Sequence, residues 1–259
     1  MQACISLQNP PFFPMWDEEA LSRAADAAQR AKVVIRQYNV SPDCIPALFK
    51  LTQYNIVILC DNSGSIKKYK REELLEATLI RIAEIAFELN ATGVSVRFLN
   101  GGAKWDKQNA QDLKKRVAKR AIKYARDTQL GNKLEKLVIK PMHLNPKCQK
   151  PIITIIITDG KPEGEPERTF QQKILEYKRH IDMDRRSIFL VSQVGSDAAA
   201  TAFLKEVERD DKIKDLVFCS EEKLDQLHER AKGAESDSDK AYASLLIELF
   251  SAAVVRRAR

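Results

Sequence analysis

The chain has 259 residues, 44% of them hydrophobic, a composition that supports one sizeable buried core. Its five cysteines are scattered and form no C-x-x-C pair, which argues against a disulfide framework and against a structural zinc site. The net charge is +7, no apolar run reaches the roughly 18 residues that span a bilayer, and the N-terminus lacks a basic leader. We therefore expect a soluble, cytoplasmic protein.

Residues 1–50 are expected to form an extension to the main domain. The stretch PPFFPMW at 10–16 is either an arm that packs on the domain or a partner-binding strip. A helix is expected at 17–40, because its apolar residues recur at helical spacing. At the other end, 233–259, a polar linker is expected to lead into a final amphipathic helix that docks on the core.

Between these extensions, strand-like and helix-like segments alternate, and we expect one domain over 51–232. Continuous β-branched runs predict buried strands at 55–60, 94–99, 152–158, 187–194 and 215–219. Helical spacing of apolar residues predicts helices at 67–90, 108–126, 132–139, 167–181 and 198–209. Such alternation predicts an α/β fold, doubly wound around a mostly parallel central sheet with helices on both faces.

Missing motifs exclude several kinds of active site. No G-x-G-x-x-G follows the first strand and no G-x-x-x-x-G-K-[ST] occurs, so neither a dinucleotide fingerprint nor a P-loop is present. Ser63 does not lie in a G-x-S-x-G elbow, which argues against a serine hydrolase. The three histidines are expected at the surface: His143, His180 and His228.

Oxygen-bearing side chains follow two of the expected strands and occupy a turn between two helices. Asp61, Ser63 and Ser65 form a D-x-S-x-S pattern after the first strand. Asp159 follows a later strand, and Thr128 lies in the turn DTQLG. Sites in this fold class lie outside the carboxyl ends of the strands, so we expect these side chains to meet there. Their hydroxyl and carboxylate oxygens suit a hard divalent cation such as Mg²⁺.

The order strand–DNSGS, then T-x-x-G, then strand–TDG resembles the metal-ion-dependent adhesion site of a von Willebrand factor A domain, over roughly residues 51–232. The resemblance implies that Ser63, Ser65 and Thr128 bind Mg²⁺ or Mn²⁺ directly. It also implies that Asp61 and Asp159 hold the ion directly or through water. The stretches SVRFLNGG and QVGSDAAATAFLKEVE further resemble a cytoplasmic microbial subgroup of these domains.

Two other interpretations of the same residues stay open. Polar turns commonly follow buried strands, so Ser65 could cap the next helix and Asp159 could belong to an ordinary turn. Asp61 also lies where a haloacid-dehalogenase-type phosphatase keeps its nucleophile. Such an enzyme requires a second aspartate two positions later, and this chain has Ser63 there.

A basic segment at 104–126 carries nine positive and two negative residues, a balance equal to the net charge of the whole chain. Within it, the helix expected at 108–126 presents Lys115, Lys119 and Lys123 as candidate partner-binding residues. An acidic protein or RNA could bind there, although no RNA motif with interleaved aromatic residues is present.

Together these features predict a metal-dependent protein-binding domain without catalytic activity. A bound Mg²⁺ or Mn²⁺ is expected to keep one coordination position open for an Asp or Glu side chain of a protein partner. The alternatives are a binder of RNA or of an acidic surface through the basic segment, and a phosphatase-like hydrolase that uses Asp61.

Overall fold

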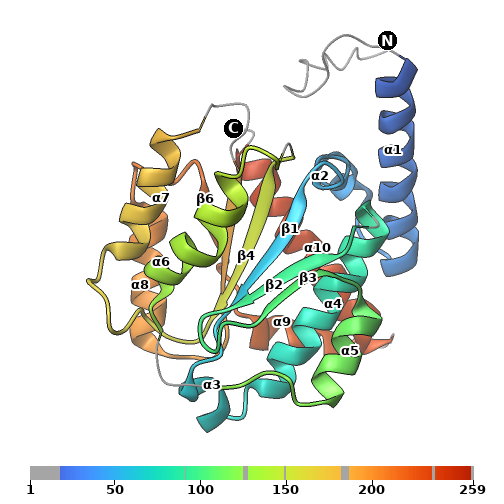
Figure 1. The fold of residues 1–259 in the computed structure, drawn as a ribbon. Coiled ribbons are helices and arrows are strands. Elements are labelled where there is room, and N and C mark those ends of the chain that lie inside the picture. The colour runs from blue at the N-terminus through green and yellow to red at the C-terminus, as the bar shows by residue number, and fades with distance from the viewer. Residues whose placement is uncertain are drawn as a thin grey trace.

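The computed structural model describes residues 18–90, 92–124, 128–148, 150–181, 187–234 and 237–257 (Figure 1). One six-stranded sheet has the order β3-β2-β1-β4-β5-β6. Four neighbouring pairs are parallel, and the edge strand β3 runs antiparallel to β2. The strands are β1 (Asn55–Cys60), β2 (Val94–Phe98), β3 (Lys104–Gln108), β4 (Ile152–Thr158), β5 (Ile188–Gln193) and β6 (Val217–Cys219). The prediction of an α/β, doubly wound, mostly parallel fold is confirmed.

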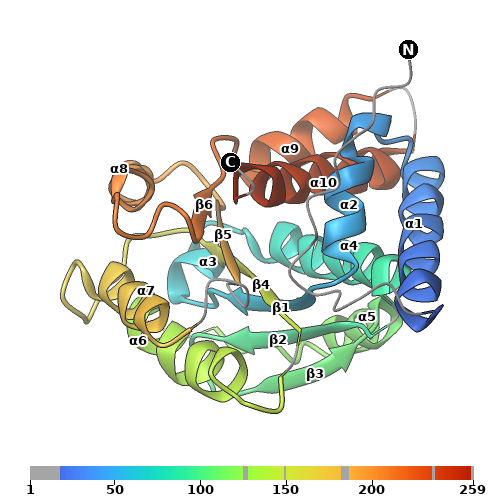
Figure 2. The same ribbon diagram turned by 90° about the horizontal axis from the view of Figure 1, so that it is seen from above.

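Helices cover both faces of this sheet (Figure 2). They are α1 (Glu18–Tyr38), α2 (Ile45–Leu51), α3 (Gly64–Lys68), α4 (Glu72–Asn90), α5 (Ala110–Ala118), α6 (Leu130–Leu134), α7 (Thr169–Arg179), α8 (Ala198–Arg209), α9 (Leu224–Lys232) and α10 (Ser238–Arg257). A short 3₁₀-helix, η1 (Pro42–Cys44), precedes α2, and α6 continues as a π-helix, η2 (Glu135–His143). Among the described helices, none combines the length and the apolar character that a bilayer-spanning segment needs.

Alternate residues of the central strands supply two separate hydrophobic cores, because successive side chains of a strand point to opposite faces. Ile56 and Ile58 of β1 belong to the core that also receives α1, α2, α4, α5, α9 and α10. Val57 and Leu59 belong to the core under α6, η2, α7 and α8. Both faces of β1 are therefore covered, which is why it reads as a continuous apolar run.

The helix predicted at 108–126 is wrong in extent. Residues 104–108 form the edge strand β3, and Trp105 of β3 packs edge-on against Phe98 with ring centroids 4.6 Å apart. α5 begins after Asn109, whose side chain caps it through the backbone N–H of Asp112, and it ends at Ala118. Among residues 104–124 of the basic segment, which the structure describes, nine are helical, so this part presents no long basic helix face.

The three lysines proposed as a binding face are exposed but lie on different local structures. Lys115 lies in α5, Lys119 occupies its C-cap position, and Lys123 lies beyond the helix. Arg120 takes a left-handed conformation (φ 50°), which turns the chain away from the helix axis so that Ile122 enters the core. Part of the basic segment, 125–127, lies outside the described residues.

The helix predicted at 67–90 is divided into α3 and α4. Lys70 takes a left-handed conformation (φ 54°) at the break, and Arg71 precedes the first residue of α4. The backbone N–H of Arg71 donates to the carbonyl of Ile66 at 2.9 Å, which folds the linking turn back onto α3. This turn directs the Arg71 side chain toward the sheet.

Regions at both ends of the chain also differ from the expected elements. Sequence reasoning missed α2 and α9, and α10 already begins at Ser238, inside the stretch read as a linker. Tyr242 of α10 is buried, and its hydroxyl lies 2.7 Å from that of Thr78 on α4. The arm or strip expected at 10–16 lies outside the described residues.

Candidate functional site

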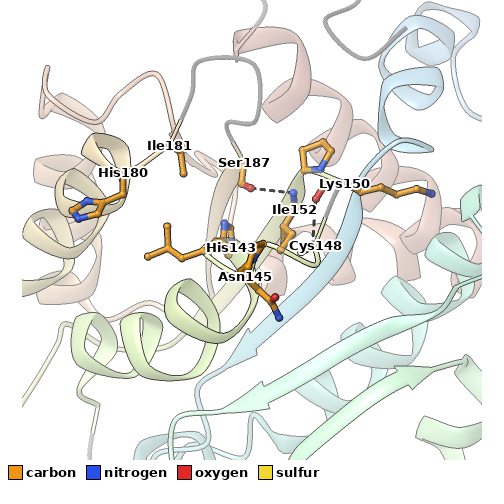
Figure 3. Close-up of a pocket in the computed structure, with 11 residues that line it drawn as sticks. His143, Asn145, Cys148, Lys150, Ile152, His180, Ile181 and Ser187 are labelled. Atoms are coloured by element: carbon orange, nitrogen blue, oxygen red, sulfur yellow. Dashed lines mark hydrogen bonds between the residues drawn. The ribbon is translucent and has the colours of Figure 1, made fainter. Parts of the chain in front are cut away.

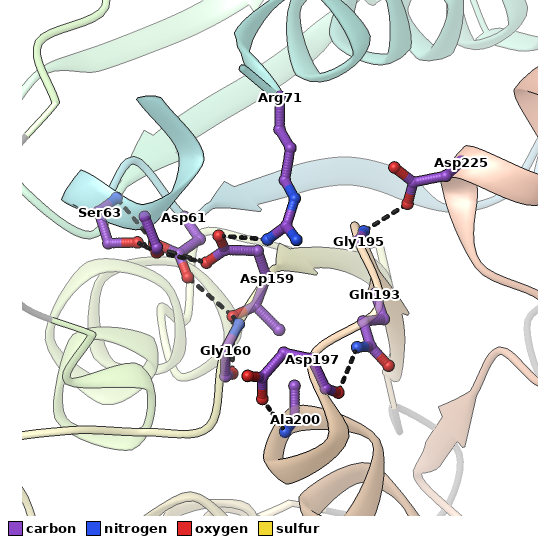
Figure 4. A network of polar contacts seen from close by, with 12 residues as sticks. Asp61, Ser63, Arg71, Asp159, Gly160, Gln193, Gly195, Asp197, Ala200 and Asp225 are labelled. Atoms are coloured by element: carbon purple, nitrogen blue, oxygen red, sulfur yellow. Dashed lines mark hydrogen bonds and ion pairs between the residues drawn. The ribbon is translucent and has the colours of Figure 1, made fainter. Parts of the chain in front are cut away.

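The strand order of the sheet reverses between β1 and β4. β2 and β3 follow on one side of β1, whereas β5 and β6 follow on the far side of β4. In doubly wound sheets this change leaves a crevice outside the carboxyl ends of the two central strands, where ligands bind. Asp61 comes directly after β1 and Asp159 directly after β4, so both carboxylates lie at this position (Figure 4).

Asp61 is fully buried, and both of its carboxylate oxygens are held. Its backbone N–H donates to the carbonyl of Ile157 at 2.8 Å, which extends the β1–β4 ladder by one residue. The N–H of Ser63 donates to Oδ1 at 2.8 Å, and the hydroxyl of Thr158 donates to Oδ2 at 2.8 Å. The orientation of Asp61 is therefore set by β4 as well as by its own loop.

Ser63 and Ser65 both direct their hydroxyls at Asp159. Ser65 Oγ donates to Asp159 Oδ1 at 2.8 Å, and Ser63 Oγ lies 3.5 Å from the same oxygen. Ser63 occupies the N-cap position of α3 without a side-chain capping bond, and Ser65 lies inside that helix. The alternative interpretation of Ser65 as a helix cap is therefore wrong, because its hydroxyl bonds a residue 94 positions away in the chain.

Three oxygen atoms of this cluster form a triangle: Oγ of Ser63, Oγ of Ser65 and Oδ1 of Asp159. Its edges measure 2.9, 2.8 and 3.5 Å. Neighbouring ligands of an octahedral Mg²⁺, each about 2.0–2.1 Å from the ion, lie about 3 Å apart. Two of the three edges are close to that spacing, and the edge from Ser63 to Asp159 is longer. The oxygen chemistry of the three atoms suits magnesium.

The cluster contains two carboxylates rather than a larger acidic group. Within the described ranges, no three His, Cys, Asp or Glu side chains come together around a possible metal position. A cation in the crevice would thus depend on the serine hydroxyls in addition to Asp61 and Asp159. Neutral hydroxyl ligands lower the charge of the donor set, which favours moderate affinity.

Electrostatics also favour a positive charge in the crevice. Burial raises the pKa of Asp61 to about 6, and the neighbouring Asp159 carboxylate adds to the rise. Hydrogen bonds from Thr158 and Ser63 oppose the rise without cancelling it. The ionised form of Asp61 is therefore less stable in the protein alone than in water, and a bound cation would stabilise it.

Arg71 supplies one positive charge at the edge of the cluster. Its Nη1 lies 2.8 Å from Asp159 Oδ2, on the carboxylate oxygen that the serines do not contact. The guanidinium lies against the backbone of Gly195, where a Cβ added to the glycine would lie 2.0 Å from Cζ of Arg71. On another side, Cζ of Arg71 lies 4.8 Å from the ring centre of Tyr69. The side chain is 14% exposed. Gly195 thus provides the space that the guanidinium fills (Figure 4).

Asn62 joins the first loop of the site to two other segments. Its side-chain amide donates to the carbonyls of Asn100 and Lys123, and its oxygen accepts the N–H of Asn100 at 2.8 Å. Asn62 is buried, so these bonds replace water. The end of the basic segment therefore borders the crevice through the backbone of Lys123.

Thr128 is buried and lies beside the loop that follows Asp159. Its carbonyl accepts the N–H of Glu163 at 3.1 Å. The Glu165 carboxylate accepts the N–H groups of Gly131 and Asn132 at 2.7 and 2.9 Å, which ties the two loops together. In the part of the chain that the structure describes, no hydrogen bond joins the Thr128 hydroxyl to the serines or to the two aspartates. The structure thus brings four of the five predicted ligands into one hydrogen-bonded cluster, with Thr128 in the adjoining loop.

Three residues of the site were missed in the sequence: Asn62, Arg71 and Thr158. Asn62 and Thr158 stand next to predicted ligands, and their polar side chains beside buried strands were a usable signal. Arg71 carried no such signal, because it lies in a segment that reads as helix and only the turn at Lys70 aims it at Asp159.

Two cavities lie at the opposite, amino-terminal edge of the sheet. One of about 150 Å³ is lined by His143, Cys148, Lys150, His180 and Ser187, among others (Figure 3). A second, of about 270 Å³, lies between α1, the residues that follow α2 and the end of α4. Because ligands of this fold class bind at the carboxyl ends of the strands, the cluster around Asp159 is the stronger candidate site.

His143, which lines the first cavity, serves the core rather than chemistry. Its ring stacks on Phe189, with centroids 5.1 Å apart, and its Nε2 lies 2.8 Å from the Thr154 hydroxyl. Burial lowers the pKa of His143 to about 3, so the ring is neutral at physiological pH. The expected surface position is found for His180, which is exposed, whereas His143 and His228 are partly buried.

No protein-family model matches the chain, and no curated protein sequence matches it. The interpretation of the site therefore rests on its own geometry.

Proposed function

We propose that this protein is a metal-dependent protein-binding domain of the von Willebrand factor A type. One Mg²⁺ or Mn²⁺ would be held by five residues: Asp61, Ser63, Ser65, Thr128 and Asp159. The observation that carries the proposal is the oxygen triangle, two of whose edges are close to the ligand spacing of a small hard cation. When bound, the cation supplies an open coordination position for a carboxylate of the partner.

The chain's own residues prepare this position. Thr158 and the Ser63 backbone hold Asp61 in one orientation, and Arg71 holds the outer oxygen of Asp159. Asn62 holds the first loop, which carries both serines, against the Asn100 loop. Such preorganisation lowers the entropic cost of binding.

A phosphatase-like use of Asp61 receives less support from the same geometry. A carboxylate nucleophile must be reached by the phosphorus atom of a phosphate ester, and Asp61 is fully buried. Ser63, two positions later, cannot act as a carboxylic general acid. We therefore favour binding over catalysis.

The test of metal binding is a calorimetric titration of the chelator-treated protein with Mg²⁺ and Mn²⁺. We expect one site in the wild type and none in Asp159→Ala, because that change removes an oxygen of the triangle and half of the acidic charge. Glu206→Ala, which removes an exposed carboxylate of α8, is the matched control and should bind like the wild type. Identical isotherms for the wild type and Asp159→Ala would refute the site.

Partner recognition requires a second experiment, on proteins retained by the immobilised domain. A true partner is retained with Mg²⁺, lost with chelator and lost with Asp159→Ala. Reversal of Lys115, Lys119 and Lys123 to Glu should slow association and flatten its salt dependence while chelator sensitivity persists, if these exposed lysines only steer an acidic partner. Binding that is indifferent to chelator and falls steeply with salt would instead favour RNA or another polyanion.

A further inference from the structure

Arg71 is built into the candidate site more firmly than a surface ion pair would be. Its guanidinium contacts the Asp159 carboxylate, lies against the backbone of Gly195 and stacks near the Tyr69 ring. Gly195 has φ +80°, and a side chain there would collide with the guanidinium. The N–H of Gly195 is in turn bonded to the Asp225 carboxylate of α9, which fixes this backbone in place. The positive charge of Arg71 is therefore a constant part of the crevice.

This fixed charge changes the electrostatic balance of the site. The carboxylates of Asp61 and Asp159 together with the guanidinium of Arg71 carry a net charge of −1, since Arg does not lose its proton in proteins. A divalent cation would bring the site to +1. Without the guanidinium, the same two carboxylates and the cation would be neutral.

We propose, on the basis of the function proposed above, that Arg71 is a specificity-determining residue that weakens metal binding in order to leave the metal-bound site positive for an anionic partner. A partner carboxylate then brings the buried site to neutrality. In a site without Arg71, the same carboxylate would leave a net negative charge beside the buried Asp61 and Asp159, which is unfavourable. Arg71 thus selects Asp or Glu over neutral oxygen donors.

The proposal predicts that one substitution changes metal affinity and carboxylate affinity in opposite directions. Arg71→Gln keeps a polar side chain but removes the charge. Metal binding should become tighter, because Coulomb repulsion of a nearby guanidinium exceeds a tenfold effect even at an effective dielectric constant of about 20. Carboxylate binding to the metal-bound site should become weaker. A merely structural role for Arg71 predicts that both affinities fall together.

The experiment uses Mn²⁺ and acetate as probes. Free Mn²⁺ is followed by electron paramagnetic resonance to give the metal affinity. Acetate is then titrated into the metal-bound protein, and displacement of coordinated water is read from the fall in water-proton relaxation. For Arg71→Gln we expect Mn²⁺ to bind at least about tenfold more tightly and acetate at least about tenfold more weakly.

Two further variants keep the result interpretable. Arg71→Lys retains the charge without the planar fork, so both affinities should stay within about threefold of the wild type. It also tests the charge if the Gln variant does not fold, because loss of either affinity in a folded Lys variant would overturn the proposal. Arg81→Gln removes an arginine of α4 that pairs with Glu84 and Asp239, away from the crevice, and should change neither affinity.

The outcomes separate this inference from the function on which it rests. If neither the wild type nor Arg71→Gln binds Mn²⁺, the proposed metal site is wrong and the inference falls with it. If the wild type binds Mn²⁺ and Asp159→Ala does not, but Arg71→Gln shows unchanged affinities or a joint loss, the site stands and only the role given to Arg71 is overturned.

Discussion

An Asp61→Asn substitution should stabilise the metal-free protein at neutral pH although it alters a buried polar residue of the candidate site. Burial raises the pKa of Asp61 from 3.8 to about 6, and a pKa rise of this size corresponds to about 3 kcal/mol of unfolding free energy. Because the folded protein binds this proton more tightly than the unfolded chain, the associated stability is present below about pH 4 and is lost as the pH rises through 6. Asn resembles the protonated acid, so it avoids that loss.

The groups around Asp61 can form hydrogen bonds with the side-chain amide of an asparagine. The amide oxygen can still accept the N–H of Ser63, and the Thr158 hydroxyl can rotate to accept from the new NH₂ group. We therefore expect Asp61→Asn to exceed the wild type in unfolding free energy by about 2–3 kcal/mol at pH 8 in chelator, and to match it near pH 4.

The assay is urea denaturation at several pH values between 4 and 8, with chelator and then with Mg²⁺. Mg²⁺ should raise the stability of the wild type at pH 8 and leave Asp61→Asn unchanged, because a ligand stabilises only the form that binds it. Glu206→Gln, an exposed change on α8, should follow the wild type throughout. Parallel pH profiles for the wild type and Asp61→Asn would refute the reasoning about the buried carboxylate.

Two further predictions concern the scaffold. Gly131→Ala should lower the unfolding free energy by roughly 1–3 kcal/mol in urea denaturation, because its Cβ would lie 2.6 Å from the backbone nitrogen of Phe170. Gly233→Ala should change the unfolding free energy little, because an added Cβ there would lie 3.6 Å from its nearest neighbour, the carbonyl oxygen of Arg230. Equal effects of the two substitutions would contradict the packing argument. Burial holds the pKa of His143 near 3, below its unfolded value of 6.5, so this residue makes stability fall as the pH drops below 6.5. His143→Gln should flatten that fall and the exposed His180→Gln should not; identical slopes in all three proteins would show that His143 does not titrate in this way.

Local sequence signals were sufficient for the central strands and for the first part of the site. β1 and β4 are buried on both faces, so their apolar runs stand out, and the polar residues that end them mark the carboxyl edge of the sheet. Strand order in a doubly wound sheet then brings Asp61 and Asp159 to one crevice. Prediction of the cluster needed no knowledge of side-chain contacts.

Tertiary structure alone decided the features that depend on a turn or an edge. β3 has few apolar residues because it lies at the sheet edge, so its sequence does not read as a strand, and only the packing of Trp105 against Phe98 identifies its place. α5 ends early because the chain must turn to bring Ile122 into the core and the Lys123 carbonyl to Asn62. Arg71 meets Asp159, 88 residues away, through one left-handed residue and the space left by a glycine. Such contacts join segments that are distant in the chain. They stabilise the protein only after the sheet has brought both segments together, so no local sequence pattern marks them.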